Sequence, residues 1–300
     1  MSKTAFSAIR KAVIPAAGFG TRFLPFTRAV PKEMIPLVDK PVIQYVIEEA
    51  AAAGITDILI VISSGKNAIQ EHFIPGGPLE ERLAATGKTA ELDALKKLDN
   101  LANIHYVYQK ELNGLGHALM QAEVFAGSDP FAVLLGDTVL HSDSKPVTAQ
   151  LCDAFAQVQS PVVALEEVPL EKVSRYGIAG LAESNGNLHK LAELVEKPAA
   201  ENAPSRLAIA SRYIFTPDIF AELAKTPKGK GGEIQLTDAM KSLLLKRPFY
   251  GLQFDGKRYD IGNKLEFLKS TVEFGLRRPE FRESFAAYLR ELIKEESHVR

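Results

Sequence analysis

A glycine-rich turn near the start of the sequence places small residues close to basic side chains. The turn follows a short apolar segment and ends at Arg22, and Lys32 comes soon after it. Small residues behind a buried strand let backbone N–H groups approach a phosphate, and two cations can neutralise its charge. We therefore expect a clamp for a triphosphate, the alternative being a ligand-free turn with two solvated cations. The turn residues assigned to the nucleotide are Ala16, Ala17, Gly18, Gly20, Thr21 and Arg22.

This turn differs from two common phosphate-binding loops. A dinucleotide fingerprint needs its third glycine where Phe23 stands. A Walker A loop needs Gly-Lys-Ser/Thr after four spacer residues, and the turn lacks that sequence. The failed glycine fingerprint argues against a Rossmann oxidoreductase.

An acidic side chain follows another apolar segment. Asp137 comes directly after the stretch 131–135 and Gly136. Ligands of open α/β sheets bind beyond the carboxyl ends of the strands, and Mg²⁺ takes one or two carboxylates together with phosphate oxygens. Asp137 is therefore expected to hold Mg²⁺, the alternative being an aspartate that caps a turn.

Alternating strand and helix patterns in the first half must position these residues. Four apolar segments are typical of buried strands, and two amphipathic segments between them are typical of helices. The strands are expected at 11–14, 57–62, 104–108 and 131–135, and the helices at 41–53 and 115–125. This alternation predicts a Rossmann-like, mainly parallel central sheet with helices on its faces.

The rest of the chain reads as additions to that sheet. The polar stretch 79–101 is expected to be a helical insertion, and closely spaced strand patterns over 162–215 predict mixed or antiparallel sheet. Helices are expected at 235–245 and 263–275, and the glycine-rich stretch 228–232 is expected to be a loop. The amphipathic tail 280–296 packs either on the protein's own core or against another subunit; its apolar face contains Phe281, Phe285, Leu289, Leu292 and Ile293.

Composition excludes several classes of protein. The 36 Lys and Arg residues balance 37 Asp and Glu, so a near-neutral chain has no bulk attraction to nucleic acid or to an anionic membrane. No apolar run reaches the roughly 18 residues of a membrane span, and the first residues lack a signal peptide. Cys152 is the one cysteine and is expected to be an inert buried thiol rather than a reactive one. We expect a cytoplasmic protein.

Several motifs together resemble the bacterial UTP–glucose-1-phosphate uridylyltransferases, or UDP-glucose pyrophosphorylases, of the sugar-nucleotide pyrophosphorylase family. The resemblance extends over about residues 10 to 277, and its motifs occur in the family's order. They are the stretch 15–50, Gln109 with Gly114-Leu115-Gly116-His117-Ala118, Leu135-Gly136-Asp137, Tyr176-Gly177, Glu196-Lys197-Pro198, the stretch 231–238, and Tyr259-Asp260-Ile261-Gly262.

The resemblance implies a reaction and a fold. UTP and glucose-1-phosphate would give UDP-glucose and pyrophosphate by in-line attack of the sugar phosphate on the α-phosphorus. That nucleophile is already ionised, so neither a base nor a covalent intermediate is needed. The implied fold is a glycosyltransferase-A-like nucleotidyltransferase fold with a small antiparallel appendage and C-terminal helices. One domain is expected over 1–277, with a nucleotide half at 10–140, a sugar-phosphate half at 141–277, and a helical tail at 278–300.

The resemblance also implies roles for individual residues. Arg22, Lys32, Asp137 and Lys197 would be catalytic, with Asp260 as a second ligand of Mg²⁺. An amide suits the imide edge of uracil, so the resemblance assigns the base to Gln109, with backbone contact at Gly114 and Gly116. His117 is expected only to begin a helix. The residues assigned to the sugar phosphate are Glu33, Tyr176, Gly177, Glu196 and Lys197, while the roles of Glu233 and Asp238 stay open.

One local difficulty concerns adjacent residues of the sugar site. In a regular strand, Glu196 and Lys197 would point to opposite faces, so both can meet one ligand only if the strand twists or breaks before Pro198. The sequence also departs from the family pattern. Arg28 stands where lysine is expected, and Ser211 and Glu266 stand where glycine is expected.

Two other functions compete with this one. A glucose-1-phosphate thymidylyltransferase would use dTTP, and a base pocket distinguishes one extra methyl group by only about 10–200-fold. A non-catalytic regulatory homologue would usually have lost phosphate or metal residues, and this chain keeps them. Galactose-1-phosphate as substrate stays open, and the resemblance implies a homodimer or homotetramer.

Overall fold

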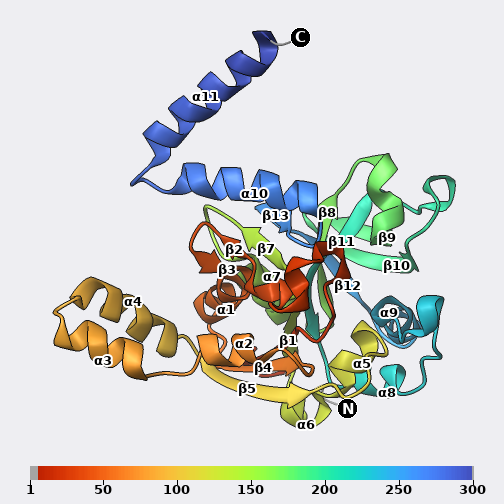
Figure 1. The fold of residues 1–300 in the computed structure, drawn as a ribbon. Coiled ribbons are helices and arrows are strands. Elements are labelled where there is room, and N and C mark those ends of the chain that lie inside the picture. The colour runs from red at the N-terminus through yellow and green to blue at the C-terminus, as the bar shows by residue number, and fades with distance from the viewer. Residues whose placement is uncertain (1–5, 299–300) are drawn as a thin grey trace.

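A nine-stranded sheet runs through the middle of residues 6–298, which the computed structural model describes (Figure 1). The strands lie in the order β5-β4-β1-β6-β11-β8-β12-β10-β9. The first four are mutually parallel, whereas β11 runs antiparallel to both β6 and β8. The bounds are β1 (Lys11–Pro15), β4 (Asp57–Ile62), β5 (Asn103–Tyr108), β6 (Phe131–Leu134), β8 (Val162–Glu167), β9 (Gly177–Asn185), β10 (Leu188–Glu196), β11 (Leu207–Phe215) and β12 (Tyr250–Gln253).

Helices cover both faces of the sheet, as the continuous apolar strands predict. In β4, Ile58 and Ile60 face a core completed by α1 (Val42–Ala52) and α7 (Val147–Val158). Leu59 and Val61, which alternate with them, face a second core on the other side of the sheet, and four further helices complete that core. These are α5 (Leu115–Met120), α6 (Glu123–Ala126), α8 (Ile219–Leu223) and α9 (Leu236–Leu244). The single helix expected at 115–125 is thus two short ones.

Two small strand pairs lie beside the main sheet. β2 (Pro36–Leu37) pairs with β3 (Lys40–Pro41), and β7 (Thr138–His141) pairs antiparallel with β13 (Lys257–Asp260). The second pair brings the chain after β6 next to the chain before α10 (Lys264–Arg277). Residues more than a hundred positions apart therefore meet above the carboxyl edge of the sheet.

The expected insertion is a helical hairpin. After α2 (Asn67–His72), α3 (Pro78–Ala85) and α4 (Thr89–Asp99) pack on each other and project from the body (Figure 1). Cys152 lies half-buried on α7, and burial raises the pKa of its thiol to about 12. At neutral pH this cysteine is therefore a thiol and not the reactive thiolate.

The C-terminal helix α11 (Arg282–His298) extends away from the body (Figure 1). Phe285 packs on α10, but Tyr288, Leu292 and Ile293 are exposed. The expected face thus packs on the protein itself only at the start of α11, where Phe281, Phe285 and Leu289 are half-buried, and a subunit contact by the rest stays a prediction. Of the expected tail and domain, residues 1–5 and 299–300 lie outside the described residues. Within the described part, no helix has the length and apolar content needed to span a membrane.

Candidate active site

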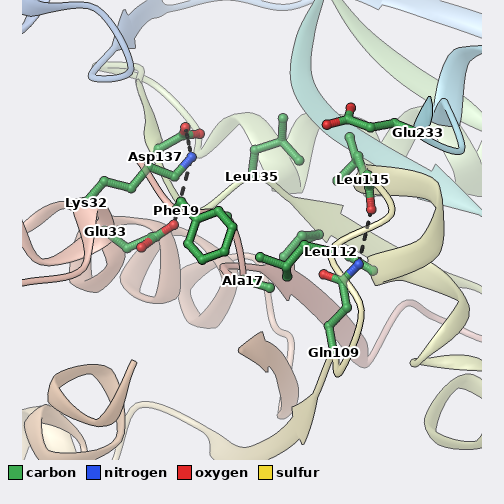
Figure 2. Close-up of a pocket in the computed structure, with 14 residues that line it drawn as sticks. Ala17, Phe19, Lys32, Glu33, Gln109, Leu112, Leu115, Leu135, Asp137 and Glu233 are labelled. Carbon is green, nitrogen blue, oxygen red and sulfur yellow. Dashed lines mark hydrogen bonds and ion pairs between the residues drawn. The ribbon is translucent and has the colours of Figure 1, made fainter. Parts of the chain in front are cut away.

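A cavity of about 490 Å³ opens at the carboxyl ends of the parallel strands (Figure 2). Such strand ends are where ligands of open α/β sheets bind. The glycine-rich turn, the Lys32 segment and the Asp137 loop all contribute to its wall. Its lining is Pro15, Ala17, Gly18, Phe19, Lys32, Glu33, Gln109, Leu112, Gly114, Leu115, Ala118, Leu135, Asp137 and Glu233.

The turn after β1 is shaped by short contacts with its neighbours. Ala16 donates its N–H to the Val61 carbonyl at 2.8 Å, and the Ser63 hydroxyl donates to the Ala17 carbonyl at 2.7 Å. Gly20 has φ +66°, and a Cβ there would lie 3.0 Å from the Cβ of Lys32. Glycine at this position therefore lets the Lys32 segment pack beneath the turn. Thr21 follows and begins a short 3₁₀ helix.

An ion pair joins the two sides of the cavity. The Lys32 Nζ lies 2.5 Å from Asp137 Oδ2 (Figure 2). Burial alone would lower the pKa of Lys32, but attraction to Asp137 and Glu33 outweighs it and leaves that pKa raised. Burial likewise opposes ionisation of Asp137, yet Lys32 and Arg22 hold its pKa below the usual value. Both groups therefore keep their charge at neutral pH.

A second buried pair lies beneath the first. Glu33 is only 1% exposed, and its Oε2 accepts a hydrogen bond from the buried Lys66 at 2.8 Å. Its Oε1 has no hydrogen-bond partner and lies 3.9 Å from the Lys32 ammonium. Desolvation raises the pKa of Glu33 despite these cations. Sequence reasoning missed Lys66, although its position just beyond the end of β4 marks it as a residue of the same sheet edge.

The two candidate metal carboxylates approach one point. Asp260 lies opposite Thr138 in the β7–β13 pairing, so it is carried to the side of Asp137. A Cβ placed on Gly262 would lie 3.1 Å from Asp260 Oδ1 and 3.5 Å from Asp137 Oδ2. The Arg22 guanidinium also reaches this point and donates to the Gly262 carbonyl at 3.2 Å.

The chemistry of this cradle fits Mg²⁺. Asp137 and Asp260 both approach the space that Gly262 leaves open. Mg²⁺ takes one or two carboxylates, and phosphate and water oxygens complete its coordination. Among the described residues, no cluster of three or more His, Cys, Asp or Glu forms an all-protein metal cage. The donor set therefore fits Mg²⁺ delivered together with a phosphate.

Gln109 is buried at the other end of the cavity. Its Nε2 donates to the Gly114 carbonyl at 3.3 Å (Figure 2). The same nitrogen lies 2.9 Å from His117 Nδ1. An amide nitrogen can only donate, so His117 Nδ1 is the acceptor of this hydrogen bond. His117 thus fixes the amide orientation, a role beyond the expected start of α5. Gly116 lies outside the cavity lining, because its N–H donates to the Ile234 carbonyl at 2.9 Å.

The residues expected at the sugar phosphate form a second group, except Glu33, which lies buried beside Lys66 in the main cavity. Lys197 has φ +46° directly after β10, so the strand breaks there and its Nζ lies 2.9 Å from Glu196 Oε1. The two adjacent side chains therefore meet on one side. Thr237 donates to Glu196 Oε2 at 2.7 Å, and a Cβ on Gly177 would lie 3.2 Å from the same oxygen.

Tyr176 connects this group to the carboxylates. Its carbonyl accepts from the Lys197 N–H at 3.0 Å, and its hydroxyl lies 3.5 Å from Asp260 Oδ2. The Arg258 guanidinium covers its ring at 4.3 Å and also bonds Glu166. Thr237 and Arg258 were missed from the sequence because neither belongs to a phosphate-type motif. Glu233 lines the main cavity, whereas Asp238 on α9 lies beside Gly229.

The departures from the family pattern have different structural consequences. Glu266 occupies the first turn of α10, where the helix dipole favours an acidic side chain. Arg28 closes a short 3₁₀ helix. Ser211 adopts φ +62° inside β11, a conformation that favours glycine.

We expect Ser211→Gly to raise the free energy of unfolding by about 0.5–1 kcal/mol, because relief of left-handed strain exceeds the added chain entropy. Chemical denaturation measures this change. The matched control is Ser242→Gly on helix α9, which should lower stability by a similar amount. Loss of stability in both variants would show that Ser211 is not strained.

Comparison with known proteins agrees with this arrangement. The family model described as nucleotidyl transferase matches residues 11–274. The UTP–glucose-1-phosphate uridylyltransferase YngB of Bacillus subtilis is 48% identical over 96% of this chain and 97% of its own length. A uridylyltransferase of the same name from Staphylococcus epidermidis is 46% identical over 95% and 98%.

Solved structures show the same fold. A UDP-glucose pyrophosphorylase complexed with UDP-glucose has a TM-score of 0.83 and 39% identity, covering 90% of this chain and 100% of that chain. The UTP-bound UGPase of Acinetobacter baumannii has a TM-score of 0.88 and 35% identity, covering 95% and 99%. This chain therefore belongs to the nucleotidyl transferase family, among relatives named UTP–glucose-1-phosphate uridylyltransferases.

Proposed function

We propose that the protein is a UTP–glucose-1-phosphate uridylyltransferase, which joins UTP and glucose-1-phosphate into UDP-glucose and releases pyrophosphate. One observation carries the proposal. A glycine-rich turn, a Lys32–Asp137 pair and a Glu196–Lys197 pair surround the carboxyl edge of one sheet, in a chain 46–48% identical to enzymes of that name over nearly its whole length. A regulatory homologue without activity has no such support.

The reaction needs positioning and charge neutralisation more than proton transfer. The phosphate oxygen of glucose-1-phosphate is ionised at neutral pH and attacks the α-phosphorus in line. The turn from Ala16 to Arg22 would hold the triphosphate. Arg22 and Lys32 would neutralise charge that develops on the leaving pyrophosphate. No side chain has to become covalently attached to the nucleotide.

Asp137 and Asp260 would hold Mg²⁺ at the Gly262 cradle. When bound, Mg²⁺ neutralises phosphate charge and lowers the repulsion between the two anionic substrates. Lys32 then has to share or release Asp137, and its ammonium is placed to turn toward the phosphates. Glu33 and Lys66, buried beneath it, limit where Lys32 can go.

Two separate groups of residues would select the two substrates. Gln109, oriented by His117, would bind the uracil edge, with Gly114 providing backbone contact. Glu196 would bind sugar hydroxyls, and Lys197 would bind the sugar phosphate. Tyr176 and Gly177 would line the sugar pocket. Glu233 faces the cavity and is placed to contact a ligand there.

We infer further that the protein acts in the cytoplasm as a homodimer or homotetramer. The exposed apolar face of α11 supports a subunit contact. The division into one domain over 1–277, with halves at 10–140 and 141–277, and a tail at 278–300 fits one shared sheet, because β6 of the first half pairs with β11 of the second.

Nucleotide preference tests the proposal. Pyrophosphate release is measured with glucose-1-phosphate and Mg²⁺, with UTP and dTTP run side by side and galactose-1-phosphate as a second acceptor. We expect release with UTP to exceed release with dTTP by about 10–200-fold. Faster release with dTTP would identify a thymidylyltransferase instead and remove the assignment of Gln109. No release, with UDP-glucose still bound, would favour the regulatory homologue.

Gly262→Ala is expected to weaken the metal site. The added methyl group would lie within 3.5 Å of Asp260 Oδ1, Asp137 Oδ2 and Arg22. We expect the Mg²⁺ concentration for half-maximal rate to rise and kcat to fall about tenfold or more, because the carboxylates must move apart. A Mg²⁺ titration of initial rate measures both effects. An unchanged titration curve would place the metal elsewhere.

A further inference from the structure

A fully buried ion pair lies behind the Asp137 loop. Arg212 on β11 is 1% exposed, and Glu49 on α1 is 8% exposed. Arg212 Nε lies 3.2 and 3.1 Å from the two oxygens of Glu49, and its NH2 lies 2.6 Å from Oε2. Glu49 Oε1 also accepts the Thr148 N–H at 3.0 Å and its hydroxyl at 2.6 Å, which ties the pair to α7. Glu49 therefore holds the guanidinium of Arg212 and is itself held by Thr148.

The same residues hold both ends of the loop between β6 and β7. Arg212 NH2 donates to the Thr138 carbonyl at 3.0 Å, and its NH1 donates to the Ser211 carbonyl at 3.0 Å. The Ser211 carbonyl in turn accepts the Leu135 N–H at 3.1 Å. Asp137 lies between these two anchored peptides. A shift of Arg212 would therefore move the peptide that carries the Asp137 carboxylate.

The anchor extends to the second carboxylate. Thr138 is the register partner of Asp260 in the β7–β13 pair, and Ile261 donates its N–H to the Asp137 carbonyl at 3.2 Å. Through the Thr138 carbonyl, Arg212 thus holds the start of β7, which Asp137 directly precedes and which pairs with Asp260 in β13. Arg212 and Glu49 are both buried and neither lines the cavity, so they would act through the loop rather than on a substrate.

We propose that Arg212 and Glu49 are positioning residues, which set the spacing of Asp137 and Asp260 through the Thr138 carbonyl. The proposal rests on the proposed function. Stability alone does not explain the pair, because a buried ion pair is often no more stable than apolar residues of the same volume. The planar guanidinium bonds Glu49 and the loop at once in a fixed geometry, which the single ammonium of lysine cannot reproduce.

Arg212→Lys tests this role against Thr148→Val as a matched control. Lysine keeps the charge opposite Glu49 but gives up the fixed fork that also reaches Thr138. Valine removes the hydroxyl bond to Glu49 from the same cluster and leaves the contacts of Arg212 to the loop. Circular dichroism establishes a temperature at which both variants are folded, and the full chain is assayed there.

We expect Arg212→Lys to lower kcat by about 10–100-fold, to raise the Mg²⁺ concentration for half-maximal rate, and to leave KM for glucose-1-phosphate within about threefold. Thr148→Val should keep kcat and the Mg²⁺ dependence near wild type, even if its thermal midpoint falls by as much as that of Arg212→Lys. Equal effects of the two variants on kcat and on the Mg²⁺ dependence would overturn the proposal, as would wild-type values of both in Arg212→Lys.

Glu49→Gln and Mn²⁺ binding keep the proposal testable if Arg212→Lys does not fold. Glutamine keeps the volume and one acceptor, so a smaller loss of kcat with the same change in Mg²⁺ dependence is expected; unchanged values of both would overturn the proposal. Mn²⁺ titration with UTP, followed by electron paramagnetic resonance, measures Mn²⁺ affinity without turnover. That affinity depends on the spacing of the two carboxylates. Weaker Mn²⁺ binding in the variants supports the positioning role even if the wild type makes no UDP-glucose, which would contradict only the proposed function. Unchanged Mn²⁺ binding in the variants would overturn the positioning role of Arg212 and Glu49.

Discussion

Asp137→Asn should abolish turnover and leave the protein folded, with kcat reduced by about a thousandfold or more. Asp137 carries the charge that pairs with Lys32 at 2.5 Å and shares the Gly262 cradle with Asp260. Asparagine keeps the size and one oxygen but removes the negative charge. Phosphate repulsion would then be screened less, and Lys32 would lose its partner.

Two further variants separate chemistry from folding. Asp137→Ala should lose activity at least as completely, while thermal unfolding shows that the fold persists. Asp143→Asn is the matched control, because Asp143 follows β7 in the same part of the chain but its side chain is 92% exposed. Its activity should stay near wild type. Near-normal turnover in the Asp137 variants would remove this residue from the mechanism.

Lys197→Ala should impair glucose-1-phosphate use far more than UTP binding. The broken strand end turns the Lys197 ammonium toward Glu196, and the side chain is still 44% exposed to an incoming ligand. A charged hydrogen bond to phosphate has no replacement in alanine. We expect KM for glucose-1-phosphate to rise about 100-fold, with the dissociation constant of UTP changed by less than about threefold.

Steady-state kinetics and calorimetric titration of UTP measure these two effects. Lys190→Ala is the control, since Lys190 lies on the same strand β10 and bonds the exposed Glu183 at 3.0 Å. That variant should behave as wild type. Equal losses of glucose-1-phosphate and UTP affinity in Lys197→Ala would indicate a structural role for Lys197.

Much of the fold follows from local patterns in the sequence. The run DILIVI of β4 is apolar on both faces, and the structure buries it between two helix layers. Pro41 before α1 and Gly54 after it mark that helix closely. The split between α5 and α6 and the projection of α11 were not predictable in this way. An amphipathic face shows that a helix needs a partner but not which one.

The site was predictable where a motif is contiguous. The glycine-rich turn, Lys32 and Asp137 border one cavity, as their places after successive strands predict. Pro198 permits the strand to end at Lys197, but the left-handed backbone of Lys197 (φ +46°) is not what a following proline favours and was not predictable from it. Lys66, Thr237 and Arg212 were missed because each acts through a partner far away in sequence. Glu49 and Arg212 are 163 positions apart, so only tertiary packing brings them together.

We propose that the uridylyl group passes directly from one bound substrate to the other. Phosphorus NMR of the protein with UTP, glucose-1-phosphate and Mg²⁺ follows every reactant and product in one sample. We expect UDP-glucose and pyrophosphate to appear in equal amounts, and UTP to stay intact when glucose-1-phosphate is left out. Pyrophosphate formed from UTP alone, or no UDP-glucose from protein that binds both substrates, would contradict it.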